Sequence, residues 1–299
     1  MRRIFKDEGY ERLFERDGCV LLKALDDAAV ARIEEFYLAN VGQDFSGVQS
    51  TIELSSAEQK AKIHNFLAQI FDEYLSVYFE NYKALAGNFS SKKPGPHGRV
   101  HAHRDWPLVN ETEYTALNLW TPLCETDADN GALGVFKGSH RLRSTIHSTN
   151  LPSTVKLSER SLRYITFFHM KPGEVLVFDT RTIHASGPNN TARQRNALSV
   201  GIIPAEARPI HYVGDRLKPS SVSELEVDED FYHNYHLERG RYISPSDDHV
   251  VNTGGYRRRE VEFTPAGIDD RDILGLYEPR AVTALRRIKD RLTAKVASR

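Results

Sequence analysis

Apolar residues recur at two different spacings along the chain, and the change falls near residue 80. Before that point, apolar residues repeat every three or four positions over 27–41 and over about 56–79, each time after a capping Asp or Ser. We predict a helix for each run, and a shorter amphipathic helix over 5–17 that Gly18 ends. A short buried strand is expected at 19–22, between the first two helices.

After residue 80 the period becomes that of strands, with glycine, proline and asparagine turns between short apolar runs. The expected strands lie at 84–89, 100–106, 114–121, 132–136, 165–170, 174–179 and 196–203. Many short strands at close spacing indicate a β-sandwich or barrel. The prediction is therefore a mainly β protein with flanking helices.

The same pattern divides the chain into three parts without a linker or repeat, and we expect one domain over 1–299. A helical part occupies 1–80 and a β core occupies 81–203, whereas 204–299 shows no clean period. We expect 43–55 to be irregular. The last part should hold long loops, a short helix near Glu229–Tyr235 and a basic terminal helix over 279–297.

Composition narrows the function classes. The 299 residues are 40% hydrophobic and 27% charged, with a formal net charge of −1, which predicts a soluble globular protein without a nucleic-acid footprint. No apolar run is long enough to cross a bilayer, and the N-terminus lacks the apolar core of a signal peptide. Two cysteines suit a reducing cytoplasm. We expect a small-molecule substrate, no nucleic acid or membrane partner, and a monomer or homodimer.

Three residues suggest a metal centre. His103 and Asp105 are two positions apart, so on a strand both side chains would leave the same face. His184 follows a second strand and would reach that face from across a barrel. Two imidazoles and one carboxylate on one side of a metal form the facial triad of non-haem Fe(II) oxygenases.

An arginine beyond the triad fits the cosubstrate of such enzymes. Arg195 lies on the strand after His184, and the turn Ser186–Asn190 is expected to fold that strand back beside His184. A facial triad leaves three iron positions, two for 2-oxoglutarate and one for O2. The far carboxylate of 2-oxoglutarate then needs a partner, and the planar guanidinium of an arginine binds a carboxylate through two hydrogen bonds.

An ordered set of short motifs resembles the phytanoyl-CoA dioxygenase family of Fe(II)/2-oxoglutarate oxygenases. The motifs lie within roughly residues 10–203. They are Asp17–Leu22, His103-X-Asp105, Asn130–Leu133 with Gly138–His140, Lys171–Glu174, His184–Asn189 and Arg195. The resemblance implies a double-stranded β-helix, that is, a jelly-roll or cupin-like core.

The resemblance also implies residue roles. His103, Asp105 and His184 would bind Fe(II), and Arg195 would bind the C5 carboxylate of 2-oxoglutarate. Ser186 and Trp120 fall where the family lines the cosubstrate pocket. Alternatives stay open: Arg193 is a rival for the carboxylate, the position of Trp120 is equally consistent with plain core packing, and that of Ser186 with a residue that only forms a turn.

The chain is therefore predicted to be an Fe(II)/2-oxoglutarate-dependent dioxygenase. It would hydroxylate, or otherwise oxidise, an unactivated C–H bond of a small-molecule metabolite of a biosynthetic pathway, releasing succinate and CO2. Related halogenases lack the carboxylate ligand, so Asp105 favours hydroxylation, desaturation or epoxidation. Two alternatives are a non-catalytic jelly-roll binding protein and a metal-dependent cupin enzyme that does not use 2-oxoglutarate.

Overall fold

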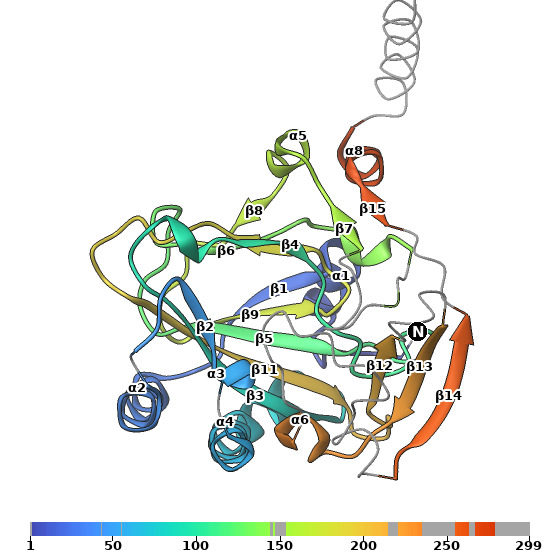
Figure 1. Cartoon of the computed structure of the whole chain (residues 1–299), viewed down its shortest axis with the longest axis horizontal. Coiled ribbons are helices and arrows are strands. Elements are labelled where there is room, and N and C mark those ends of the chain that lie inside the picture. The colour runs from blue at the N-terminus through green and yellow to red at the C-terminus, as the bar shows by residue number, and fades with distance from the viewer. Residues whose placement is uncertain are drawn as a thin grey trace, which may run out of the picture.

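A computed structural model of the chain describes residues 2–42, 44–54, 56–143, 146, 154–214, 221–234, 255–262 and 267–278. Two antiparallel sheets face each other at its centre, with the helices outside them (Figure 1). The larger sheet has six strands in the order β1-β9-β5-β11-β3-β2. These strands are β1 (Cys19–Lys23), β9 (Glu174–Asp179), β5 (Leu117–Pro122), β11 (Arg195–Pro204), β3 (Tyr82–Lys92) and β2 (Val48–Ser50).

The smaller sheet has four short strands in the order β4-β10-β6-β8. They are β4 (Val100–His103), β10 (His184–Ser186), β6 (Leu133–Val135) and β8 (Thr166–Phe167). From β3 onward the chain passes repeatedly between the two sheets, because β3, β5, β9 and β11 lie in one and β4, β6, β8 and β10 in the other. This alternation is the jelly-roll arrangement, and it confirms the predicted fold class.

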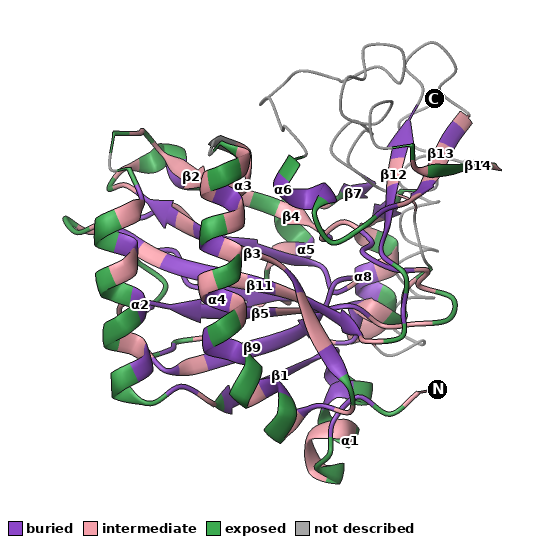
Figure 2. Cartoon of the chain, turned by 90° about the horizontal axis from the view of Figure 1, so that it is seen from below, coloured by how far each residue is buried: buried purple, intermediate pink, exposed green. Residues whose placement is uncertain are grey.

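Helices cover the outer face of the larger sheet. Figure 2 shows α2 (Asp27–Asn40) and α4 (Ala57–Tyr78) lying across the strands, with exposed residues turned away from them. The side chains of Asp26 and Ser56 cap these helices by accepting hydrogen bonds from the backbone N–H groups of Ala29 and Gln59. Apolar residues of both helices, Ile33, Tyr37, Ile63, Leu67 and Phe71, are buried in one core with the outward-facing residues of the sheet.

The remaining N-terminal helices are shorter. Helix α1 (Glu8–Asp17) ends at Gly18, whose φ of 73° is the left-handed conformation that closes a helix. The expectation of an irregular segment over 43–55 is wrong where β2 adds a strand at the sheet edge and α3 (Thr51–Leu54) follows it. Their shortness hides any period in the sequence.

The region after residue 204 is more regular than expected. A three-stranded sheet is formed by β12 (Ile210–Gly214), β13 (Ser221–Glu226) and β14 (Arg257–Glu262). The expectation of long loops there is wrong because β14 is almost wholly exposed and carries charges on both faces, so it shows no alternation. Cross-strand ion pairs, such as Arg259 with Glu224 at 2.7 Å, replace apolar pairing.

Short elements complete the description. The predicted short helix corresponds to α6 (Phe231–Asn234), whereas the predicted helix over 279–297 lies outside the described residues. The others are η1 (Pro96–Gly98), η2 (Ser139–Arg141), β7 (Val155–Lys156), α5 (Glu159–Leu162), β15 (Ile268–Asp269) and α8 (Asp270–Tyr277). Among the helices described, none combines the length and apolar character needed to span a bilayer.

Candidate metal and cosubstrate site

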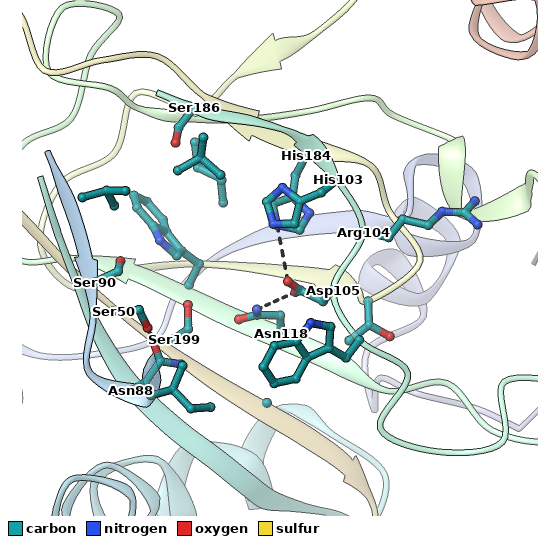
Figure 3. A pocket seen from close by; sticks show the side chains of 18 of the residues that line it. Ser50, Asn88, Ser90, His103, Arg104, Asp105, Asn118, His184, Ser186 and Ser199 are labelled. Carbon is teal, nitrogen blue, oxygen red and sulfur yellow. Dashed lines mark hydrogen bonds and ion pairs between the residues drawn. The ribbon is translucent and has the colours of Figure 1, made fainter. Parts of the chain in front are cut away.

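The two predicted histidine ligands are cross-strand neighbours in the smaller sheet. His103 ends β4 and His184 begins β10, and the two residues stand opposite each other in the antiparallel ladder. Their ring centroids are 4.2 Å apart (Figure 3). The ladder therefore brings together two imidazoles from distant parts of the sequence.

Asp105 reaches the same point by a different route from the one expected. Strand β4 stops at His103, so Asp105 does not share a strand face with it. Instead, the backbone N–H of Asp105 donates to the carbonyl of Thr180 at 3.1 Å, which holds the loop beside β9. Its Oδ1 lies 3.5 Å from His184 Nε2.

The three side chains suit a divalent metal ion. One ligand atom from each of His103, Asp105 and His184 lies within 4.8 Å of the others. Nitrogen donors from two imidazoles and one carboxylate oxygen, gathered on one side and open to a cavity, are the donor set of non-haem iron sites. The residues present therefore fit iron(II).

Hydrogen bonds orient all three candidate ligands. Nδ1 of His103 lies 2.8 Å from the carbonyl of His101, and Nδ1 of His184 lies 3.0 Å from that of Thr182. A proton on each Nδ1 leaves Nε2 as the nitrogen with the lone pair. Asn118 on β5 donates from Nδ2 to Oδ2 of Asp105 at 2.7 Å, which leaves Oδ1 turned to the histidines.

Arg195 is a buried cation in the same cavity. It begins β11, is 3% exposed and lies over the ring of Trp120, with its guanidinium carbon 5.6 Å from the ring centroid. Within the described part of the chain, its Nε and Nη1 have no hydrogen-bond partner. Burial lowers the pKa of Arg195 to about 10. A buried guanidinium with unused donors is costly unless an anion binds there.

A second buried cation, Lys92, was not found from the sequence. It stands opposite Arg195 in the β3–β11 ladder, and its Nζ donates to Ser186 Oγ and to the carbonyl of Gly187, both at 2.6 Å. Burial, with the nearby charges of Arg195 and Arg99, lowers its pKa to about 7. The strand expected at 84–89 stops short of Lys92, so its place on the cavity face of β3 becomes evident only from the pairing with β11.

The turn after β10 runs differently from the expectation. Strand β11 does not fold back beside His184, because β10 and β11 belong to different sheets. The segment between them crosses the molecule, and Asn189 anchors it by donating from Nδ2 to the carbonyls of Lys92 and Arg193. The crossing leaves Arg193 exposed and brings Arg195 into the cavity.

One cavity of about 610 Å³ collects the predicted site residues. It is lined by all six: His103, Asp105, Trp120, His184, Ser186 and Arg195. Three other histidines are not among the candidate ligands: His101 lines the cavity and is exposed, whereas His97 and His169 do not line it. Trp120 is buried both in a core cluster and against Arg195, so the two interpretations of it are compatible.

The jelly roll and the three-residue centre are the fold and the donor set that are typical of non-haem iron, 2-oxoglutarate-dependent oxygenases. The chain belongs to the phytanoyl-CoA dioxygenase family, whose model matches residues 14–197. This confirms the resemblance drawn from the motifs.

Similar proteins come from distant organisms. A phytanoyl-CoA dioxygenase domain-containing protein 1 homolog of Dictyostelium discoideum is 23% identical over 60% of this chain and 64% of its own length. A probable alpha-ketoglutarate-dependent hypophosphite dioxygenase of Stutzerimonas stutzeri is 28% identical over 40% of this chain and 44% of its own length. The chain thus covers less than two thirds of either relative.

A solved structure shares the fold. EvdO2 from Micromonospora carbonacea var. aurantiaca, complexed with 2-oxoglutarate, aligns with 69% of this chain and 92% of its own at a TM-score of 0.50 and 17% sequence identity. At this identity the likeness concerns the fold alone.

Proposed function

We propose that the protein is an Fe(II)/2-oxoglutarate-dependent dioxygenase that oxidises an unactivated C–H bond of a small-molecule metabolite, most simply by hydroxylation. Substrate, 2-oxoglutarate and O2 would be converted to hydroxylated product, succinate and CO2. In this proposal iron(II) is held by His103, Asp105 and His184. When bound, the iron supplies the chemistry that activates dioxygen, and the protein supplies binding and orientation.

The observation that carries the proposal is the buried guanidinium of Arg195 beside the candidate metal centre. Its Nε and Nη1 have no hydrogen-bond partner in the described part of the chain. A dicarboxylate that reaches from the metal to Arg195 would supply the missing acceptors and the opposite charge. A metal-dependent cupin enzyme without 2-oxoglutarate would leave this buried charge unexplained.

Neighbouring groups suit the same carboxylate. Lys92 would add a second positive charge, and the hydroxyl of Ser186, held at 2.6 Å from Lys92 Nζ, would add a hydrogen bond. Trp120 would form an apolar wall along the guanidinium. Exclusion of water from this end of the cavity would strengthen each of these interactions.

Two further observations bear on the reaction and on the extent of the catalytic unit. The carboxylate of Asp105 occupies the position that a halogenase would leave free for halide, which supports hydroxylation or a related oxidation.

Tyr232, on α6 and beyond the matched residues 14–197, also lines the cavity. This supports a single catalytic unit that extends past β11.

The test is an anaerobic titration of the purified protein with Fe(II) and then 2-oxoglutarate. We expect a visible metal-to-ligand charge-transfer band, which should be lost or greatly weakened in Arg195→Met. Arg193→Met is the matched control, because Arg193 is exposed and lies outside the cavity. Iron binding without a band would favour the cupin alternative, and no iron binding would favour the non-catalytic protein.

A further inference from the structure

A strip of small uncharged polar side chains lies across the cavity from the candidate metal ligands. Strand β3 contributes Asn88 and Ser90, β11 contributes Ser199 and β2 contributes Ser50 (Figure 3). Register places them together, because Asn88 stands opposite Ser199 and Ser90 stands opposite Ser50. We call these four residues the polar strip.

The polar strip has unused hydrogen-bonding capacity. Its one internal side-chain bond joins Ser50 Oγ to Asn88 Oδ1 at a long 3.3 Å. No hydrogen bond within the described part of the chain occupies the hydroxyls of Ser90 and Ser199. Next to the metal centre, Oδ1 of Asn118 is buried without a partner, although its Nδ2 is bound to Asp105. A ligand in this cavity would thus meet acceptors and donors together.

The chemistry of the polar strip selects for hydroxyl groups. A serine hydroxyl and an asparagine amide each donate and accept hydrogen bonds, as an alcohol does. A carboxylate or phosphate only accepts and an ammonium only donates, so neither would use both the donors and the acceptors of the strip. An acyl chain would desolvate the strip and return no hydrogen bond.

The charged residues that line the cavity outside the metal centre do not give the polar strip a net charge. Lys92 and Arg195 lie at the cosubstrate end, and Arg104 donates to the carbonyls of Ser139 and Arg143, turned away from the cavity (Figure 3). The other charged lining residues outside the metal centre are Glu53 and Arg99, of opposite sign, with Arg99 exposed. The substrate region therefore offers no net charge to an ionic substrate.

An aromatic residue that lines the same cavity offers a stacking surface. Trp106 follows Asp105 directly, lines the cavity and is only partly buried. His211 holds its ring edge-on, with centroids 5.9 Å apart. Gly201 also lines the cavity, and it adds no side chain there; a Cβ at that position would lie 3.0 Å from Leu108 Cδ1. An indole beside a flat polar sheet suits a rigid ring whose edges carry hydroxyls and whose face carries C–H bonds.

We propose that the substrate is a neutral, hydroxyl-rich ring compound of the glycoside class, bound between the polar strip and Trp106. Asn118 would accept a hydrogen bond from the substrate next to the reacting carbon. The volume is sufficient, since cavities of about 300–1,000 Å³ hold drug-sized ligands and 2-oxoglutarate fills only a small part. This inference rests on the proposed function, because it assigns His103, Asp105 and His184 to the metal, Arg195 to the cosubstrate, and the polar strip to the substrate.

The test is calorimetric titration of the anaerobic protein with Fe(II) and 2-oxoglutarate present. The probes are the methyl glycosides of glucose, galactose and mannose, compared with methyl glucuronide, methyl glucosaminide and cyclohexylmethanol. We expect at least one neutral glycoside to bind about tenfold or more tightly than the three charged or apolar probes. Tighter binding of any of those three, or no binding of any neutral glycoside, would overturn the proposal.

Two variants test the polar strip itself. Asn88→Leu and Ser199→Val should each weaken glycoside binding by about three- to tenfold, the loss expected for one or two hydrogen bonds. Asn88→Leu should leave the affinity for 2-oxoglutarate unchanged. Ser223→Val, on β13 outside the cavity, is the matched control. Equal glycoside affinity in all three variants would contradict the proposal. Absence of the charge-transfer band in the unmodified protein would instead contradict the proposed function. The calorimetric titrations with glycosides measure heat and do not depend on that band.

Discussion

On β3 and β11, adjacent cross-strand pairs point to opposite sides of the larger sheet. Phe89 and Leu198 stand opposite each other and are buried beneath the helices, whereas Asn88 and Ser199, one position away, line the cavity. The helix face is apolar and closely packed. The cavity face carries polar and charged groups, among them Arg195 with unused donors. A single strand thus places residues for stability and residues for binding at alternate positions.

Stability and ligand binding therefore depend on residues that lie on different faces of the same strands. Substitutions on the helix face should change the free energy of unfolding and leave binding intact in the fraction that folds. Substitutions on the cavity face should do the reverse, because polar groups held without partners cost stability and are retained for the ligand.

The largest effect is expected from Phe89→Ala on the helix face. Phe89 is fully buried and packs edge-on against Tyr37, with centroids 5.2 Å apart. Its truncation should lower the free energy of unfolding by about 3–5 kcal/mol. Denaturant unfolding measures this, with Asn88→Ala as the neighbouring control, for which a change within about 1 kcal/mol is expected. Equal losses of unfolding free energy in Phe89→Ala and Asn88→Ala would contradict the difference between the helix face and the cavity face.

Arg195→Met should show the reverse behaviour. Removal of one partner of a buried charge pair should weaken 2-oxoglutarate binding by about 2–5 kcal/mol, or roughly thirty- to several-thousand-fold. The free energy of unfolding without ligand should stay the same or rise, because the variant no longer buries an uncompensated charge. Arg193→Met should change neither quantity. A destabilised Arg195→Met protein with normal 2-oxoglutarate affinity would show that Arg195 is structural.

Asn118→Leu should act through Asp105. Loss of the 2.7 Å hydrogen bond to Oδ2 frees the carboxylate to rotate, and such supporting bonds contribute about ten- to a hundredfold to metal affinity. Competition with a chromogenic chelator measures Fe(II) affinity directly. Asn190→Leu, on the exposed segment between β10 and β11, is the control. Unchanged Fe(II) affinity in Asn118→Leu would show that Asn118 does not hold Asp105 in place for the metal.

The smallest effect is a pH dependence of cosubstrate binding. Burial lowers the pKa of Lys92 to about 7, so its charge is present below pH 7 and is lost as the pH rises. Because the charged form binds a dicarboxylate better, 2-oxoglutarate affinity should fall by up to about tenfold between pH 6 and pH 8. Lys92→Met should bind more weakly at pH 6 and show a flat profile. The same slope in Lys92→Met would assign the dependence to another group.

The sequence was informative where short motifs carry the chemistry. His103, Asp105 and His184 were found from residue type and order, although Asp105 arrives on a loop and not on the strand. Lys92 was missed because it precedes Lys93 and Pro94, so the stretch has the composition of a solvated loop. Its burial comes from pairing with β11, which local pattern does not reveal.

The same reason explains the errors after residue 204. Strand β14 is stabilised by charged cross-strand partners such as Arg259 and Glu224, so neither face shows an apolar period. The helices α1, α2 and α4, in contrast, were predicted closely, because a capping residue and a repeating apolar stripe are both local features. Ser56, for example, caps α4 as its position before the stripe predicts.

The pairing of His103 with His184 also has a kinetic consequence. These residues lie far apart in the chain, so two of the three candidate ligands come together only after β4 and β10 have paired. Long-range strand pairing is a slow part of folding, since the entropy of closing a long loop must be lost first. We therefore expect newly made chains to capture iron only once the barrel has closed. A half-folded chain would then offer a redox-active metal at most the side chains of His103 and Asp105, without His184.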